Sequence, residues 1–192
     1  MRVAGIVLAA GASTRMGTNK MLLHVNGEPL VRRAVRSAQA AAFAPIVVIL
    51  GHESEHVKRA LGGITCEFAL NPDYTGPTSG SLHCGLRALP AHCDAAVVML
   101  GDMVHVTGEM LRVIAERAAQ RTDAPLVVSR YGDVTAPPLL FRRTLFDELL
   151  AWKGEGCGKA VVKAHAQEAV YVDWPESALV DVDTPEDFAA LS

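Results

Sequence analysis

A chain of 192 residues, of which 50% are hydrophobic and 20% charged, is long enough for one globular domain and too apolar to be intrinsically disordered. Its formal net charge of −3 gives no general electrostatic surface for nucleic acid or membrane, and no apolar run approaches the ~20 residues that span a bilayer. We therefore expect a single cytoplasmic domain over residues 1–192, without a signal peptide, in which any anion site is a local cluster.

Short apolar runs rich in Val, Ile and Leu alternate along the chain with longer stretches of helical periodicity. The apolar runs predict strands over 2–9, 45–50, 66–70, 95–101, 125–129, 138–141 and 168–173. The periodic stretches predict helices over 29–41, 54–62, 79–89, 108–121, 143–152 and 184–192. Strands that are apolar on both faces are typical of a parallel sheet covered by helices. This alternation predicts an α/β fold of the doubly wound, Rossmann-like kind, with a mostly parallel sheet between two helical layers.

Two segments do not fit the simple alternation. We expect residues 130–138 to form a loop on the substrate side or an edge strand, and residues 154–159 to form a flexible loop. Cys157 in the second segment has glycine neighbours and Lys159 nearby, but an inert thiol is the preferred interpretation. None of the four cysteines is in a CxxC pair, so free thiols are expected.

A loop of small residues with two cations, Ala10–Lys20, directly follows the first predicted strand. In parallel α/β sheets, ligands bind outside the carboxyl ends of the strands. Gly11 and Ser13 lack bulk, so backbone N–H groups can approach a ligand, while Arg15 offers a planar fork and Lys20 a point charge for phosphate oxygens. The loop matches neither the Walker A motif nor the GxGxxG motif, which are the common phosphate-binding patterns. These residues alone leave two alternatives: a triphosphate site, or a surface turn with solvated cations.

This loop carries a resemblance to a known family. The pattern Leu8-Ala9-Ala10-Gly11-x-Ser13-x-Arg15-Met16-Gly17-x-x-Lys20 resembles the signature of the MobA-like nucleotidyltransferases, and the resemblance continues at 51–52, 71–82, 101–103 and 181–188. The Leu-Ala-Ala-Gly variant is similar to molybdenum cofactor cytidylyltransferases, since guanylyl-transferring relatives usually carry glycine where Ala10 stands. The resemblance implies a nucleotidyltransferase fold, CTP as donor, and nucleotide contacts from the loop residues. These contacts are Leu8, Ala9, Ala10, Gly11 and Ser13, with Arg15 and Lys20 holding the triphosphate.

Nucleotidyl transfer requires Mg²⁺, which binds hard oxygen ligands and often takes only one or two carboxylates. Asp102 follows the strand predicted at 95–101, at the same sheet edge as the opening loop. By itself this residue would more readily be read as a cap of the next helix, but the resemblance implies a metal ligand. The resemblance places the second ligand at Asp183 or Asp181, with Asp183 slightly preferred.

The segment 71–82 is a long loop that opens a predicted helix. Ser79, Gly80 and Ser81 combine small side chains with the free N–H groups of a helix start. The resemblance implies that these residues, and Asn71 before them, contact the base and ribose. An N-cap role for Ser79 or Ser81 is compatible with such binding. His52 and His56 have the spacing of a zinc pair but lack a third ligand nearby, so metal binding there is not expected.

The resemblance implies transfer of CMP from CTP to the phosphate of a molybdopterin-type molybdenum cofactor, with a molybdoenzyme apoprotein as a further partner. Three departures from the family pattern lie on the presumed acceptor side: Val104, the stretch Ala136-Pro137-Pro138, and the segment 154–159. They leave two enzyme alternatives open, transfer to a sugar phosphate or methylerythritol phosphate, and use of GTP. An alternative of another class is a non-catalytic module that binds and delivers the cofactor.

Overall fold

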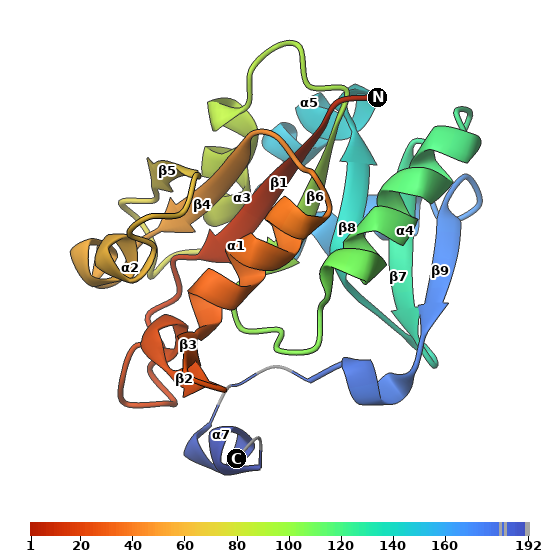
Figure 1. The fold of residues 1–192 in the computed structure, drawn as a ribbon. Helices are drawn as coiled ribbons and strands as arrows, with labels where there is room; N and C mark the ends of the chain where they lie inside the picture. The colour runs from red at the N-terminus through yellow and green to blue at the C-terminus, as the bar shows by residue number, and fades with distance from the viewer. Residues whose placement is uncertain (181, 183, 191–192) are drawn as a thin grey trace.

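A seven-stranded sheet forms the middle layer of the protein (Figure 1). The computed structural model describes residues 1–180, 182 and 184–190. The strands, in spatial order, are β5 (Glu67–Leu70), β4 (Ile46–Leu50), β1 (Val3–Ala9), β6 (Ala95–Leu100), β8 (Val134–Arg142), β7 (Leu126–Tyr131) and β9 (Val170–Trp174). Only β8 is antiparallel to its neighbours among these described strands. The predicted fold class, a mostly parallel sheet in a Rossmann-like α/β fold, is confirmed.

Helices cover both faces of the sheet. One face carries α1 (Leu30–Ala40), α2 (Ser54–Ala60) and α4 (Gly108–Gln120), and the other carries α3 (Thr78–Ala88), α5 (Phe146–Ala151) and α6 (Cys157–Ala164). The strands alternate between the two cores, since Val7 packs under the first set of helices and its neighbour Ile6 under the second. This is why both faces of the strands are apolar in the sequence. Within the described residues, no helix has the length and apolarity needed to cross a bilayer.

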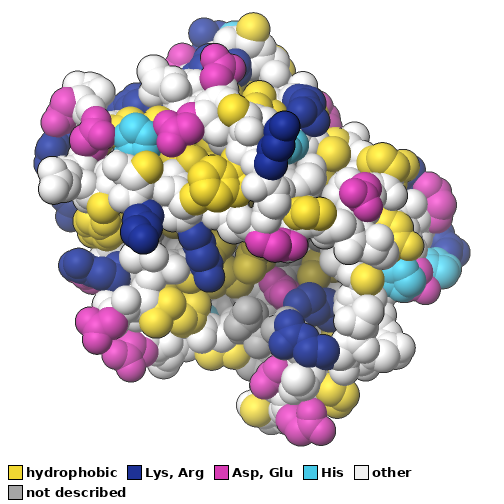
Figure 2. Space-filling model, turned by 180° about the vertical axis from the view of Figure 1, so that it is seen from behind, with side chains coloured by type: hydrophobic (Ala, Val, Ile, Leu, Met, Phe, Trp, Pro, Cys, Tyr) yellow, Lys and Arg dark blue, Asp and Glu magenta, His cyan; other side chains and the backbone are white. Residues whose placement is uncertain are grey.

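Shorter elements complete the described part of the chain. They are the 3₁₀ turn η1 (Lys20–Leu22), the hairpin strands β2 (His24–Val25) and β3 (Glu28–Pro29), the turns η2 (Arg143–Leu145) and η3 (Glu176–Ala178), and helix α7 (Pro185–Ala189). Figure 1 shows β2, β3 and α7 at one end of the molecule. Thr184 caps α7 in a capping box with Asp187. On the face with α3, α5 and α6, basic and acidic side chains are intermixed (Figure 2).

The prediction for residues 130–138 was wrong, because β8 is an interior strand between β6 and β7. Prolines cannot donate to a sheet ladder, so Pro137 and Pro138 argued against an interior strand. The structure places them where the β7–β8 register shifts, between Val128 and Arg130. Their carbonyls are used instead: Ser129 Oγ donates to Pro138 O at 2.7 Å, and Tyr131 Oη donates to Pro137 O at 3.0 Å. The apolar half of β8 was predicted as a strand at 138–141, but the irregularity concealed its first residues and its interior position.

The prediction of a flexible loop over 154–159 was also wrong in its second half, where α6 begins at Cys157. This helix has eight residues and follows two glycines with positive φ, Gly154 and Gly156. A helix of two turns presents too few apolar positions for its period to be recognised. What remains of the predicted loop is a connector between α5 and α6, residues 152–156.

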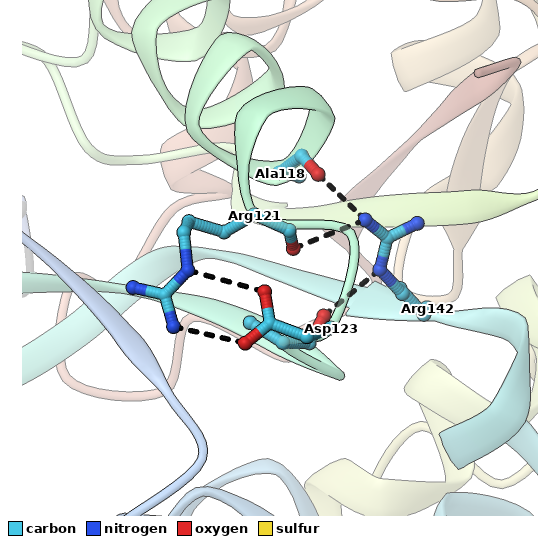
Figure 3. Close-up of polar contacts among 5 residues, drawn as sticks. Ala118, Arg121, Asp123 and Arg142 are labelled. Atoms are coloured by element: carbon cyan, nitrogen blue, oxygen red, sulfur yellow. Dashed lines mark hydrogen bonds and ion pairs between the residues drawn. The ribbon is translucent and has the colours of Figure 1, made fainter.

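Arg142 joins the end of β8 to the end of α4 and is a stability determinant (Figure 3). Its guanidinium donates to the carbonyl of Ala118, in the last turn of α4, at 2.5 Å and to the carbonyl of Ala124, in the loop before β7, at 2.8 Å. The last carbonyls of a helix have no partner within the helix. We expect Arg142→Met to lower the free energy of unfolding by about 2 kcal/mol, because charged donors to backbone carbonyls are lost. The neighbouring Arg121, which pairs with Asp123 in solvent, gives the matched control Arg121→Met. Urea denaturation of both variants tests this, and equal midpoints would contradict it.

Candidate functional site

The candidate site begins where the carboxyl ends of three parallel strands lie side by side. Ala9 at the end of β1 is in register with Leu50 of β4, and Leu8 with Leu100 of β6. The opening loop leaves this edge after Ala10, and the segments that follow β4 and β6 leave it at Gly51 and Gly101. Loops from distant parts of the sequence are therefore brought to one place by the sheet.

Ser13 organises the opening loop. It has a positive φ of 52°, its carbonyl accepts from the N–H groups of Met16 and Gly17, and its hydroxyl accepts from the Lys20 N–H at 3.1 Å. The loop is thereby closed on itself, with Gly11 and Arg15 exposed at its surface. The small residues that the sequence singled out thus form a compact turn at the sheet edge. Their contacts with a nucleotide remain a prediction.

Asn19 is a loop residue that sequence reasoning missed. It is 5% exposed, its Nδ2 donates to the His52 carbonyl at 3.2 Å, and its Oδ1 accepts from the Met21 N–H at 3.1 Å. The first bond attaches the loop to the segment after β4, and the second caps η1. An asparagine directly before a short helical turn was the available signal, since Asn is a preferred N-cap.

Lys20 and Asp102 meet in an ion pair between Lys20 Nζ and Asp102 Oδ2. Both side chains are mostly buried, at 15% and 7% exposed. Gly101 makes this approach possible: its N–H continues the ladder to Leu8 O at 3.0 Å, and a Cβ there would lie 2.6 Å from the sulfur of Met21. Since Met21 follows Lys20 in η1, the glycine lets η1 pack against the end of β6. The structure thus brings together a cation and a carboxylate that lie 82 positions apart in the chain.

Asp102 does not cap the following helix, and its role as a metal ligand remains a prediction. The N-cap of α4 is Thr107, whose Oγ1 accepts from the Met110 N–H at 3.2 Å. The carboxylate of Asp102 offers hard oxygens in a mostly buried position, which fits Mg²⁺ held by one or two carboxylates and by phosphate oxygens. No cluster of three or more His, Cys, Asp or Glu side chains suited to a metal occurs in the described part of the chain. The other predicted ligands, Asp181 and Asp183, lie outside the described residues.

The C-terminal segment packs against the opening loop through apolar side chains. Val182 is fully buried, and with Val180 and Phe188 it joins a small cluster that includes Met16 and Val104. Val104 is one of the positions that departs from the family pattern, and here it serves this packing. The cluster connects the opening loop, the segment after β6 and the chain's end on one side of the site.

The predicted nucleotide contacts before and within α3 fall into two groups. Asn71 is buried, and its Nδ2 donates to Ser81 Oγ at 3.0 Å while its Oδ1 accepts from the Asp73 N–H at 3.1 Å. Gly80 lies against the same amide, because a Cβ there would be 3.5 Å from Asn71 Nδ2. Ser79 points elsewhere, with its hydroxyl donating to Gly154 O at 2.5 Å. Neither serine caps α3, whose N-cap is Pro77.

Glu155 is a second site residue that the sequence did not indicate. Its Oε2 accepts from the Thr78 N–H at 3.2 Å and from Thr78 Oγ1 at 2.8 Å. A carboxylate at the first turn of a helix interacts favourably with the free N–H groups there. The pairing spans 77 residues, so no local pattern could have predicted it.

The features discounted from the sequence have structural roles. The His52 N–H donates to Ala10 O at 3.2 Å, and the rings of His52 and His56 both face Glu53. Cys157 is buried, and burial raises the pKa of its thiol above the usual range. The described cysteines are all free. A raised pKa keeps the thiol protonated at neutral pH and therefore poorly nucleophilic.

The chain is similar in sequence and in structure to known proteins. Residues 5–170 match the family model described as MobA-like NTP transferase domain. The bifunctional protein GlmU of Kineococcus radiotolerans is 36% identical over 149 residues, which cover 75% of this chain and 30% of that protein. The crystal structure of Rv0371c from Mycobacterium tuberculosis H37Rv superposes with a TM-score of 0.87 at 27% identity, covering 100% of this chain and 98% of that one. Its complex with manganese gives a TM-score of 0.78 at 28% identity, covering 100% and 98% of the two chains.

Proposed function

The chain belongs to the MobA-like NTP transferase family, and from this premise we propose that it transfers CMP from CTP to the phosphate of a molybdopterin-type molybdenum cofactor, releasing pyrophosphate. The observation that carries the proposal is the ion pair of Lys20 with Asp102 at the carboxyl edge of the sheet, next to a small-residue loop. A cation and a hard-oxygen ligand at one point are what a triphosphate and its divalent ion require.

In this proposal each side chain has a distinct task. Lys20 and Arg15 hold the triphosphate, and loop N–H groups approach its oxygens. Asp102 holds a divalent ion, which supplies charge neutralisation at the α-phosphate and the leaving pyrophosphate. The solved complex of Rv0371c with manganese supports a divalent ion as the cofactor. Asp183 or Asp181 would be the second ligand. An acceptor phosphate oxygen attacks the α-phosphorus in line, and the bond from that phosphorus to the bridging oxygen of pyrophosphate breaks.

The choice of base and acceptor rests on the family resemblance. Alanine at position 10, where guanylyl-transferring relatives usually carry glycine, supports CTP, and Asn71, Ser79, Gly80 and Ser81 would contact the nucleoside. The product would pass to a molybdoenzyme apoprotein in the cytoplasm. A different phosphate acceptor is the second candidate, because this chain spans about a third of the length of curated relatives such as GlmU and departs from the family pattern on the acceptor side.

A nucleotide screen tests the proposal. We expect CTP with Mg²⁺, at about 100 times its Kd, to raise the melting temperature by about 5–10 °C, and GTP, ATP and UTP to raise it less. Pyrophosphate release with CTP should then require the molybdenum cofactor and not glucose 1-phosphate or methylerythritol phosphate. A larger shift with GTP would reassign the base. A rise in melting temperature with the molybdenum cofactor, and none with any of the nucleotides, would favour the alternative of a non-catalytic module that delivers the cofactor.

A further inference from the structure

Strand β5 is an open edge of the sheet with two exposed hydrophobic side chains. β4 is its neighbour on one side, and the described part of the chain has no strand on the other (Figure 1). Phe68 is 42% exposed and Leu70 is 58% exposed. Proteins usually protect such edges with charged side chains, as Asp173 does in the opposite edge strand β9, where it pairs with Arg130. In β5 the charged residue is Glu67, at the beginning of the strand, so the apolar part of the edge is left open to another strand.

The backbone groups of Phe68 and Leu70 point to the same open side. In a parallel ladder, the N–H and C=O groups of alternate residues are directed at the same neighbouring strand. The Asn71 N–H donates to Leu50 O of β4 at 2.8 Å, so the backbone groups of Ala69, two positions earlier, also face β4. Those of Phe68 and Leu70 face away from it. The edge therefore presents hydrogen-bonding groups and apolar side chains from the same two residues.

We infer that this edge docks a second copy of the chain, and that the two β5 strands pair antiparallel about a two-fold axis at Ala69. Phe68 of each copy then lies opposite Leu70 of the other. Each of these pairs exchanges both of its N–H···O bonds, because the backbone groups of both residues face outward. The two sheets join into one, and the assembly closes as a dimer because each copy has a single β5 edge.

The side chains of the strand suit this arrangement. Phe68 and Leu70 stand beside Val48 and Leu50 of β4, whose side chains lie in the core under α1 and α2, so they project from that face of the sheet. Each aromatic ring then packs against a leucine of the other copy, which is a favourable cross-strand pair. Ala69 projects from the other face. At the axis the two strands approach most closely, with a Cα–Cα distance of about 4.5 Å, and alanine is small enough for that position.

Other positions of the axis fit less well. An axis at Glu67 would place two carboxylates opposite each other, which destabilises a strand pair. An axis at Leu70 would place Phe68 opposite Pro72, which has no N–H to donate. An axis at Phe68 would place Leu70 opposite Cys66, which precedes the first residue of β5. The proposed axis avoids all three conflicts and sets Glu67 opposite a neutral asparagine.

Sedimentation equilibrium of the full chain tests the association, and it requires neither nucleotide nor acceptor. Pairing of two four-residue strands buries less surface than the roughly 1,200–2,000 Å² of a stable interface, so the dimer is expected to be weak. We expect a reversible monomer–dimer equilibrium with a Kd on the order of 10–100 µM. A chain that remains monomeric at concentrations about tenfold above this range, or that forms trimers or larger assemblies, would overturn the inference.

A lysine at position 70 tests the apolar contact. We expect Leu70→Lys to raise the Kd of the dimer at least about tenfold, because a charge replaces an apolar contact in both cross-strand pairs and an edge lysine opposes strand pairing. The Leu70 side chain is exposed in the monomer, so the variant should keep its fold. Val134→Lys is the matched control, since Val134 is 51% exposed at the start of another strand, β8. This control should leave the Kd unchanged, and equal weakening by both variants would contradict the inference.

A cysteine at position 69 tests the place of the axis. Directly opposite residues of an antiparallel pair have Cβ atoms about 4.5–5.5 Å apart, which is near disulfide geometry. The partly exposed Cys66 and Cys84 are first replaced by serine. In that background, Ala69→Cys should give a covalent dimer on oxidation with copper phenanthroline. Glu67→Cys should not, because position 67 lies opposite Asn71. Equal cross-linking by the two variants would overturn the two-fold pairing at Ala69. So would the absence of cross-linking by Ala69→Cys at a concentration where sedimentation shows dimers.

Discussion

Replacing Asp102 by alanine is expected to lower the rate of nucleotidyl transfer on the order of 10³-fold, with the fold retained. The expected size follows from the loss of charge stabilisation at a transferring phosphoryl group, which has effects of about 10²–10⁵ in comparable sites. The carboxylate is mostly buried at the end of β6, where it is positioned by Gly101 and contacted by Lys20. Pyrophosphate release under saturating CTP and acceptor measures the effect.

Replacing Lys20, the ion-pair partner of Asp102, by alanine separates binding of the triphosphate from binding of the divalent ion. We expect it to raise the KM for CTP, because the triphosphate loses a point charge, while Asp102→Ala mainly lowers kcat and weakens binding of the divalent ion. Direct titration of Mn²⁺ with CTP present provides a readout besides turnover. Lys58→Ala, which breaks the exposed pair with Glu55, is the matched control and should change none of these quantities. An unchanged KM for CTP in Lys20→Ala would refute the role of Lys20, and near-normal pyrophosphate release at saturating CTP in Asp102→Ala would refute that of Asp102.

The sequence was sufficient for most of the fold because each strand carries its own signal. Val47 and Val48 pack in opposite cores, so β4 reads as an unbroken apolar run, and the neighbouring strand β1 likewise contributes side chains to both cores. Only the second half of β8 was predicted, at 138–141, because its prolines lie at a register shift that the pairing with β7 reveals. Helix α6 was not predicted, because its eight residues give too few apolar positions for a helical period to be recognised.

The parts of the candidate site that directly follow parallel strands could be predicted from the sequence. Strand ends of a parallel sheet lie at one edge, so the opening loop and Asp102 could be placed together before any coordinates existed. Partners set by tertiary packing could not be found in this way. Glu155 reaches Thr78 across 77 positions, and the apolar lining of the cavity beside α3 and α6 draws on five separate elements, β1, α3, β6, β8 and α6. The predicted ligands Asp181 and Asp183 stay predictions, because they lie outside the described residues.

Gly51→Ala is expected to destabilise the protein and to weaken nucleotide binding at the same time. A Cβ at this position would lie 2.5 Å from the Ala10 carbonyl oxygen, 2.5 Å from Tyr74 Cβ and 2.9 Å from Ala10 Cβ. These atoms belong to the backbone or are fixed to it, so no rotamer change relieves the overlap. The backbone must shift, at a cost of about 2–3 kcal/mol, or about 5–10 °C in melting temperature for a chain of this size.

The shift should reach the nucleotide site because Ala10 begins the opening loop. Its carbonyl accepts from the His52 N–H at 3.2 Å, and the segment after β4 also accepts from Asn19 in the same loop. We therefore expect the affinity for CTP with Mg²⁺ to fall at least tenfold, about 1.4 kcal/mol. Gly11→Ala is the stability control, since a Cβ there meets no atom within 4 Å. Its melting temperature should match wild type. If Gly51→Ala loses stability but binds CTP normally, the end of β4 does not position the loop, and the proposed site must be held by other contacts.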